Sequence, residues 1–277
     1  MNEPVSIKKG TDVQLDIESL AFGGMGVAHL NNIVIFVKDA IPGQKVTARI
    51  TKKRSSYLEA RSLEVLNDSP YQVDVPCEHF KDCGGCTFQN LDYTQQTMAK
   101  EIQVKDIFKR IGKFPDVQCE PIIDCDEIFH YRNKMEFTFS NCEYLPESEK
   151  GKIPSDFSLG LHVSGIWDKI LDINQCHIQS PVANEILAVI KKLTRDLEPY
   201  NIREHRGFLR KVIIRVGENT DDVMVNIVTC RENQKMLNPI VESLIEKFPS
   251  ITSIVNNIIT RKAGDSKGGH QVLLYGN

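Results

Sequence analysis

The fold of the N-terminal segment is decided by the stretch IVIFVKDAIPGQKVTARI, residues 33–50. It holds two short runs rich in β-branched residues, separated by the turn sequence Ile41-Pro42-Gly43. Runs of this kind bounded by Pro and Gly predict β-strands. The runs of the first segment are Val13–Ile17, Ile33–Val37, Lys45–Ile50 and Ala60–Val65. Because no helical period competes with them, they predict a small β-barrel or sandwich.

Length and composition limit the classes of protein that this chain can belong to. It has 277 residues, of which 26% are charged and 41% hydrophobic, and its net charge is −3. This length predicts two domains. The chain has no apolar stretch of the length that a membrane span requires, and its N-terminus lacks the apolar core of a signal peptide. We therefore expect a cytoplasmic protein with no membrane partner, whose nucleic-acid surface, if present, is a local patch.

After the polar run Asn67–Pro70 the pattern alternates between helix and strand. Apolar residues at helical spacing predict helices over Leu91–Gly112, from Ser180-Pro181 onward, and over Gln234–Phe248. The apolar residues of the first helix are Met98, Ile102, Val104, Ile107, Phe108 and Ile111. The predicted strands are Lys134–Phe139, Ser158–Val163, Lys211–Val216, Val223–Thr229 and Ile251–Ile259, with a hairpin at 217–222 and an exposed loop at 143–156. The chain is therefore expected to be α+β, with a barrel followed by a mainly antiparallel sheet and flanking helices.

The cysteines give the strongest chemical signal. Three of the eight, Cys77, Cys83 and Cys86, follow the spacing C-x5-C-x2-C, and Cys176 lies in a polar loop after a strand. Four thiolates suit an iron–sulfur cluster or a structural zinc ion. Because zinc sites usually pair two C-x2-C hooks and no second pair is present, the spacing favours a 4Fe–4S cluster, with zinc as the alternative. The other four are interpreted as packed thiols: Cys119, Cys125, Cys142 and Cys230.

Two features of the first segment suggest contact with nucleic acid. The glycine-rich stretch Phe22–Ala28 is not followed by a helix, which excludes a dinucleotide-binding motif. It is either a tight barrel turn or an RNA contact that includes Phe22. The second feature is a basic stretch with one aromatic residue: Lys45, Arg49, Lys52, Lys53, Arg54, Tyr57 and Arg61. Small barrels bind single-stranded RNA through such surfaces, although an ordinary solvated face has the same composition.

A third cationic feature lies at the start of the strand predicted over Lys134–Phe139. Alternation places Met135 and Phe137 on one face, and Arg132, Lys134 and Glu136 on the other. The cationic face could contact RNA phosphates or the gap left by an extruded base. It could equally be a face closed by its own ion pairs.

Taken together, these features resemble the RNA 5-methyluridine methyltransferases, the S-adenosylmethionine-dependent uracil-C5 enzymes. The segments similar to their TRAM domain, an OB-like RNA-binding barrel, are Phe22–Ala28, Phe36–Gly43 and Val46–Lys53. The segments similar to their central domain are the cysteine hook, Tyr131–Lys134, Leu171–Ile173 with Cys176, and Leu209–Arg215. The resemblance covers the whole chain and strengthens the prediction of a 4Fe–4S cluster on Cys77, Cys83, Cys86 and Cys176.

The resemblance implies a chemistry that these residues do not themselves carry. In the family a cysteine thiolate adds to uracil C6, C5 takes the methyl group from S-adenosylmethionine, and a carboxylate removes the C5 proton. No S-adenosylmethionine motif and no cysteine in the catalytic context is present here, so no catalytic residue is assigned. We expect an enzyme whose S-adenosylmethionine-binding domain follows this chain, which ends at Leu273–Asn277 in what we interpret as a hairpin turn.

The expected organisation is a TRAM barrel over residues 1–68 and a cluster-bearing central domain over 69–277. Within the latter, residues 91–118 form a helical excursion that docks on the methyltransferase domain, and the 91–112 helix could mediate self-association when that domain is absent. The expected partner is ribosomal or transfer RNA, and the chain alone is expected to be inactive. The alternative is a non-catalytic RNA-binding module with a structural four-cysteine metal site.

Overall fold

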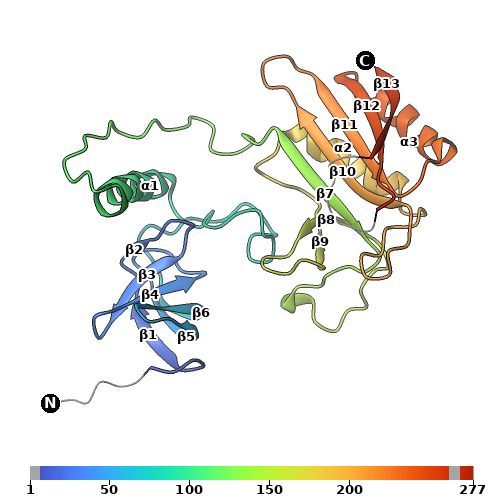
Figure 1. Ribbon diagram of the computed structural model, residues 1–277. Helices are drawn as coiled ribbons and strands as arrows, with labels where there is room; N and C mark the ends of the chain where they lie inside the picture. Colours follow the sequence, from blue (N-terminus) through green and yellow to red (C-terminus); the bar gives the residue numbers. More distant parts are fainter. Residues whose placement is uncertain (1–6, 262–268, 277) are drawn as a thin grey trace. The chain divides into compact units, whose positions relative to one another are not determined.

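The computed structural model describes residues 7–261 and 269–276, which fold as an α+β chain with two sheets and three α-helices (Figure 1). The chain divides into two compact units. The first contains residues 1–75 and 86–126, and the second contains residues 76–85 and 127–277. This division differs from the boundary expected at residue 68, because the helical segment after Cys86 groups with the barrel. Among the described residues, no helix is long and apolar enough to cross a membrane.

The first unit is built on a curved six-stranded sheet with the order β1-β5-β6-β4-β3-β2. Its strands are β1 (Asp12–Asp16), β2 (Ser19–Leu20), β3 (Gly26–Leu30), β4 (Ile33–Lys38), β5 (Lys45–Lys53) and β6 (Tyr57–Asn67). The pairs are antiparallel except β4 with β6, and the edge strand β1 also contacts β3. Alternate residues such as Ile35, Val46 and Leu58 point inward and are buried. The predicted small barrel is confirmed.

The glycine-rich stretch forms the turn between β2 and β3, which the sequence did not predict as strands. Gly23 and Gly24 have φ values of +90° and +85°, a region that L-residues with a side chain rarely adopt. A Cβ on Gly24 would lie 2.5 Å from Thr87 Cγ2. The tight-turn interpretation is therefore confirmed, while the exposed Phe22 at its start leaves the RNA interpretation open.

Helix α1 (Tyr93–Ile107) belongs to the first unit and continues as a π-helical turn over Phe108–Gly112. The Asp92 side chain caps it by accepting a hydrogen bond from Thr94 N at 3.0 Å. Gln103 Nε2 fastens it to the barrel by donating to the carbonyl groups of Leu20 and Ala21. The predicted helix is thus present, and it packs with the barrel.

The second unit contains a seven-stranded sheet with the order β13-β12-β11-β10-β7-β8-β9. Its strands are β7 (Lys134–Ser140), β8 (Ser158–His162), β9 (Ile170–Asp172), β10 (Leu209–Val216), β11 (Val223–Thr229), β12 (Ile251–Ile258) and β13 (His270–Gly276). All neighbours are antiparallel except β11 and β12, which are connected through a helix. The predicted mainly antiparallel sheet and the hairpin between β10 and β11 are confirmed.

Two helices cover this sheet. Helix α2 (Pro181–Leu193) contacts β10 and helix α3 (Gln234–Lys247) contacts β12, and the two helices also contact each other. Ser180 occupies the predicted N-cap position of α2 without a side-chain hydrogen bond. The apolar stripe of α2 and the inward residues of β7 form buried core: Ala183, Ile186, Leu187 and Ile190, with Met135, Phe137 and Phe139.

One local prediction is wrong. Residues 273–276, interpreted as part of a hairpin turn, lie in strand β13, where Ser253 pairs with Gly276 and Val255 with Leu273. The Tyr275-Gly276 sequence favours a turn locally, but pairing with β12 overrides that preference because each ladder hydrogen bond satisfies a backbone group. The polar segment 143–156 is a largely exposed loop, as predicted, with one 3₁₀ turn over Glu147–Glu149.

Candidate functional site

The cysteine-rich segment Pro76–Gly85, called the hook segment below, belongs to the second unit. It folds through short-range hydrogen bonds, in which Phe80 N donates to Cys77 O at 3.2 Å and Cys83 N to His79 O at 2.8 Å. Gly85 N also donates to the sulfur of Cys83 at 3.3 Å. Backbone amides directed at cysteine sulfurs stabilise thiolate character, which a metal ligand requires.

Backbone pairing fastens one end of the hook segment to the β8–β9 connection. Cys83 forms an antiparallel bridge with Val163, Gly84 N donates to His162 O at 3.1 Å, and Ser164 N donates to Asp82 O at 2.9 Å. A Cβ on Gly84 would lie 3.2 Å from the same His162 oxygen. Glycine therefore permits this close approach of two backbones.

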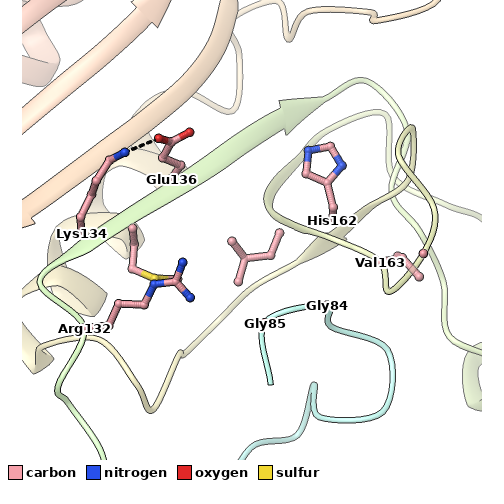
Figure 2. Close-up of a pocket in the computed structure, with 10 residues that line it drawn as sticks. Gly84, Gly85, Arg132, Lys134, Glu136, His162 and Val163 are labelled. Carbon is pink, nitrogen blue, oxygen red and sulfur yellow. Dashed lines mark hydrogen bonds and ion pairs between the residues drawn. The ribbon is translucent and has the colours of Figure 1, made fainter. Parts of the chain in front are cut away.

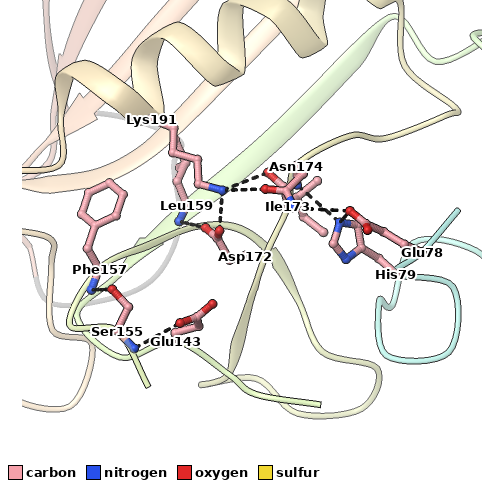
Figure 3. A network of polar contacts seen from close by, with 10 residues as sticks. All are labelled: Glu78, His79, Glu143, Ser155, Phe157, Leu159, Asp172, Ile173, Asn174 and Lys191. Atoms are coloured by element: carbon pink, nitrogen blue, oxygen red, sulfur yellow. Dashed lines mark hydrogen bonds and ion pairs between the residues drawn. The ribbon is translucent and has the colours of Figure 1, made fainter. Parts of the chain in front are cut away.

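Side chains fasten the other end of the hook segment to the loop after β9 (Figure 3). Asn174 N donates to His79 Nε2, and Asn174 Nδ2 donates to Glu78 Oε1, both at 3.3 Å. Lys191 of α2 donates to Asn174 Oδ1 at 3.2 Å and forms an ion pair with Asp172. Burial lowers the pKa of His79 below its ordinary value, which favours a neutral ring that can accept a hydrogen bond.

Cys176 lies in the same loop and is buried. Its backbone is held by the amide of Asn184 on α2, because Cys176 N donates to Asn184 Oδ1 at 2.9 Å and Asn184 Nδ2 donates to Cys176 O at 3.1 Å. The loop that carries the predicted fourth ligand is thus fixed by a side chain of α2.

The four predicted ligands are all cysteines, a donor set that suits iron–sulfur chemistry. Cys77, Cys83 and Cys176 belong to the second unit, and Cys86 to the first, where Gln89 Nε2 donates to its sulfur at 3.1 Å. Within residues 7–261 and 269–276, no three His, Cys, Asp or Glu side chains converge closely enough to hold a metal ion. The metal site therefore remains a prediction.

The remaining cysteines differ in burial. Cys119 and Cys230 are half-buried, and burial raises the pKa of the Cys230 thiol. Cys125 and Cys142 are exposed, so the interpretation of these two as packed thiols is wrong. Both lie in segments outside regular secondary structure, where no apolar neighbour covers them by periodicity.

A pocket of about 520 Å³ lies beside the hook segment within the second unit (Figure 2). Gly84 and Gly85 form one wall, and the start of β7 forms the opposite wall with Arg132 and Lys134. The complete lining is Gly84, Gly85, Arg132, Lys134, Met135, Glu136, Leu161, His162, Val163 and Gly165. The pocket thus combines a wall of two glycines, three apolar side chains and two cations, a lining that suits an anionic ligand.

The charges of the pocket are partly neutralised. Glu136 accepts from Lys134 Nζ at 2.6 Å and lies 3.6 Å from Lys211 Nζ, and the hydrogen bond from Lys134 holds the pKa of Glu136 below its ordinary value. Desolvation and the nearby Lys211 lower the pKa of His162. The Arg132 side chain forms no ion pair with any described residue, so it is the cation of the pocket that remains available to an anion.

Three of the six predicted RNA-binding cations of the barrel pair with carboxylates. Arg49 pairs with Asp12, Lys52 with Glu59 and Arg61 with Asp39, at 2.7, 2.8 and 3.2 Å. Lys53 donates to Ile7 O at 3.2 Å, and Tyr57 packs edge-on against Phe36. The structure therefore favours Lys45, Lys53 and Arg54 as the available cations of the stretch, because no carboxylate of the described chain pairs with them.

Sequence patterns did not reveal several of these participants. Glu136 was placed on the correct strand face, but its ion pairs with Lys134 and Lys211 and the contribution of His162 depend on strand pairing. The contacts of Lys191 and Asn174 likewise join residues that no periodicity connects. The glycines between Cys83 and Cys86 were the one signal that backbone would approach closely at this place.

Comparisons with known proteins agree with the fold. Residues 8–63 match the model of the TRAM domain. The chain is 35% identical to an uncharacterized RNA methyltransferase of Porphyromonas gingivalis over 271 residues, covering 94% of this chain and 58% of the relative. It is 34% identical to an uncharacterized RNA methyltransferase of Chlorobaculum tepidum over 291 residues, covering 99% and 59%.

A solved structure shows the same fold. The crystal structure of Pyrococcus abyssi tRNA (uracil-54, C5)-methyltransferase in complex with S-adenosyl-L-homocysteine matches with a TM-score of 0.66 and 23% identity, covering 95% of this chain and 55% of that one. The chain spans somewhat more than half the length of the curated relatives that it matches. The chain therefore carries a TRAM domain and is similar, along nearly all of its own length, to RNA methyltransferases.

Proposed function

We propose that this chain is the N-terminal, RNA-binding and cluster-bearing part of an S-adenosylmethionine-dependent RNA uracil-C5 methyltransferase. The observation that carries the proposal is similarity to RNA methyltransferases over 94% of the chain, which extends far beyond the TRAM domain at residues 8–63. The fold shared with a tRNA (uracil-54, C5)-methyltransferase supports the uracil-C5 class. The product is 5-methyluridine in ribosomal or transfer RNA.

The proposed RNA surface has two parts, one in each unit. On the barrel it consists of Lys45, Lys53 and Arg54 with Phe22, whose ring is 81% exposed and can stack on a base. In the second unit it is the pocket beside the hook segment, where Arg132 binds a phosphate or stacks on an unpaired base. Its volume of about 520 Å³ falls within the usual range of ligand sites, about 300–1,000 Å³.

We propose that Cys77, Cys83, Cys86 and Cys176 together hold a 4Fe–4S cluster. The support is the spacing of the hook, the thiolate donor set, and the fixation of both the hook segment and the Cys176 loop within the second unit. When bound, such a cluster supplies a cross-link between distant parts of the chain or an electron-transfer centre. A structural zinc ion on the same cysteines is the alternative.

The uracil-C5 reaction itself is proposed to require residues beyond those that this chain supplies. The thiolate that adds to C6 and the carboxylate that removes the C5 proton are not assigned to any of its residues, and S-adenosylmethionine is expected to bind to the domain that carries them. Four of the eight cysteines belong to the proposed cluster site, and none of the eight lines the pocket.

Helix α1 is proposed to dock on that methyltransferase domain, or on a second copy when the domain is absent. The apolar residues predicted to form one face of the 91–112 helix are exposed, on α1 and on the π-helical turn that follows it: Met98 50%, Ile102 56%, Val104 46%, Ile107 40%, Phe108 42% and Ile111 77%. A concentration of exposed apolar side chains is typical of interfaces in proteins that are otherwise soluble. Sedimentation of the chain alone at micromolar concentration would distinguish self-association from a monomer with an uncovered face.

The experiment that tests the proposed function is a methyl-transfer assay on the full-length protein. Radiolabelled S-adenosylmethionine is supplied with ribosomal RNA and, separately, with transfer RNA lacking 5-methyluridine, and the labelled nucleoside is identified by chromatography. We expect 5-methyluridine from the full-length protein and no product from residues 1–277 alone. Label in another nucleoside, or no label with RNA binding intact, would instead support another methyltransferase or the non-catalytic RNA-binding module.

The pocket is tested by RNA binding of residues 1–277. Removing the guanidinium in Arg132→Ala should weaken binding of a single-stranded RNA about tenfold, because a charge-assisted contact to phosphate is lost. Arg195→Ala is the control, since Arg195 is an exposed arginine of the same unit outside the pocket. Equal affinity of the two variants would remove the pocket from the RNA surface.

A further inference from the structure

The polar network of Figure 3 connects helix α2 with the hook segment, and the residues involved lie far apart in the sequence. We infer that Asn174 and Lys191 are positioning residues that hold the hook segment against the Cys176 loop before any metal binds. The metal-related part of this inference rests on the proposed cluster, whereas the positioning of the hook segment itself is a property of the metal-free chain.

The hook segment is attached at two places, and a predicted ligand lies at each. Cys83 takes part in the backbone bridge to Val163, which is reinforced by the bond from Ser164 N to Asp82 O. Cys77 precedes Glu78 and His79, which accept the two hydrogen bonds from Asn174. Both thiols are therefore placed by contacts that need no metal.

The amide of Asn174 has a role that few side chains can fill. Its oxygen accepts from Lys191 Nζ at 3.2 Å while its nitrogen donates to Glu78 Oε1 at 3.3 Å. The amide thus lies between a cation and a carboxylate with the correct atom toward each. An aspartate could accept from Lys191 but could not donate to Glu78, and its charge would repel that carboxylate.

Lys191 is held in turn by the last residue of β9, Asp172. It forms an ion pair with Asp172, and both side chains are about one-fifth exposed. The other oxygen of Asp172 accepts from Leu159 N at 3.0 Å, so the carboxylate is anchored to β8. An ion pair with this much burial and a second hydrogen bond is stronger than one at a fully exposed surface.

The same helix also fixes the fourth predicted ligand. Asn184, which holds the backbone of Cys176, precedes Lys191 by seven residues on α2, so both side chains lie on one face two turns apart. Helix α2 therefore positions Cys176 directly through Asn184, and positions the hook segment through Lys191 and Asn174. Preorganised ligands lose less conformational freedom when the metal binds.

The inference is tested by amide hydrogen exchange on metal-free residues 1–277, kept reduced and with chelator present. The variants are Asn174→Ala, Asn174→Asp and Lys191→Gln, with Lys192→Gln as the matched control, because Lys192 is the exposed neighbour on α2. In the three test variants we expect exchange at the Asp82 and Cys83 amides, which both donate to His79 O, to rise about tenfold, the effect of losing one charge-assisted hydrogen bond. Amides of β10, which lie outside the network, should be unchanged and report on overall folding.

A second measurement addresses the metal. The protein is first reconstituted anaerobically with ferrous iron and sulfide. The decrease in absorbance of the thiolate-to-iron charge-transfer bands is then measured in the presence of excess chelator. The test variants should lose iron several-fold faster than the Lys192→Gln control. Two results would overturn the inference. The first is that the hook-segment amides of the unaltered protein exchange as fast as those of an unprotected peptide. The second is that the test variants exchange at the same rate as the control. Failure of every variant and of the unaltered protein to bind iron would overturn the proposed cluster, while the exchange data would still decide the positioning role.

Discussion

The ion pairs of the barrel predict how strongly salt should weaken RNA binding. Six cations lie in the basic stretch, and three of them, Arg49, Lys52 and Arg61, are paired with Asp12, Glu59 and Asp39. A cation that already neutralises a carboxylate releases few counterions from RNA. For single-stranded nucleic acid each phosphate contact contributes about −0.7 to the slope of log affinity against log salt. Three free cations therefore predict a barrel contribution of about −2, and six would predict about −4.

The assay is fluorescence anisotropy of a labelled single-stranded RNA with residues 1–277 at several salt concentrations. Between 50 and 200 mM salt the barrel contribution should lower affinity about 20-fold, whereas six free cations would lower it about 300-fold. Because the proposed RNA surface also includes the pocket of the second unit, the change between variants is more informative than the total slope.

Two variant sets separate free from paired cations. The first replaces Lys45, Lys53 and Arg54 by Gln and should make the slope less negative by about 2. The second set replaces both partners of all three ion pairs: each carboxylate by the corresponding amide, and each cation by Gln. This leaves the net charge unchanged and should leave the slope unchanged. If the second set flattened the slope as much as the first, the carboxylates would have to leave their partners when RNA binds, and the reasoning from ion pairs would be refuted.

Three further predictions concern stability. Gly24→Ala should lower the free energy of unfolding by about 1–3 kcal/mol in urea titrations, because its φ is +85° and the new Cβ would lie 2.5 Å from Thr87 Cγ2; an unchanged midpoint would contradict this geometry. Phe137→Ala should cost about 3–5 kcal/mol by the same measurement, because Phe137 is fully buried, and a loss below 1 kcal/mol would contradict its place in the core. Desolvation and Lys211 lower the pKa of His162 below 6.5, so the unfolded chain binds that proton more readily than the folded chain. The free energy of unfolding should therefore decrease as the pH falls below about 6.5. His162→Asn should weaken this dependence, and an identical pH profile of the variant would contradict the prediction.

The elements of both sheets could be predicted where the signal is local. The alternation of Met135, Phe137 and Phe139 identifies a half-buried strand, and Ser180-Pro181 identifies the start of a helix. Strands β2, β3 and β13 were missed because they are too short, too rich in glycine or too turn-like to show a period of two, and pairing with neighbouring strands stabilises them.

The charges of the candidate site could be predicted only in part. Arg132 and Lys134 were identified from the alternation in their predicted strand. The four predicted metal ligands were identified from the cysteine spacing, which can be recognised without knowing the fold. Whether a cation is available to RNA depends on which carboxylate lies beside it. Asp12 and Arg49 are 37 residues apart and meet because β1 pairs with β5, a register that composition does not specify.

By itself the sequence determined the two strand-rich regions, the helices, the cysteine hook and the likeness to RNA methyltransferases. These features depend on residues that are close together in the chain, or on the order in which its motifs follow one another. Only the tertiary structure decided that half of the cations in the basic stretch are paired, that a pocket opens between Gly84 and Arg132, and that Lys191 reaches the hook segment through Asn174. Apart from the pair of Lys52 with Glu59, those contacts join residues at least 17 positions apart. Their existence depends on strand register and helix packing, which are set by the burial of the whole core and not by any local pattern.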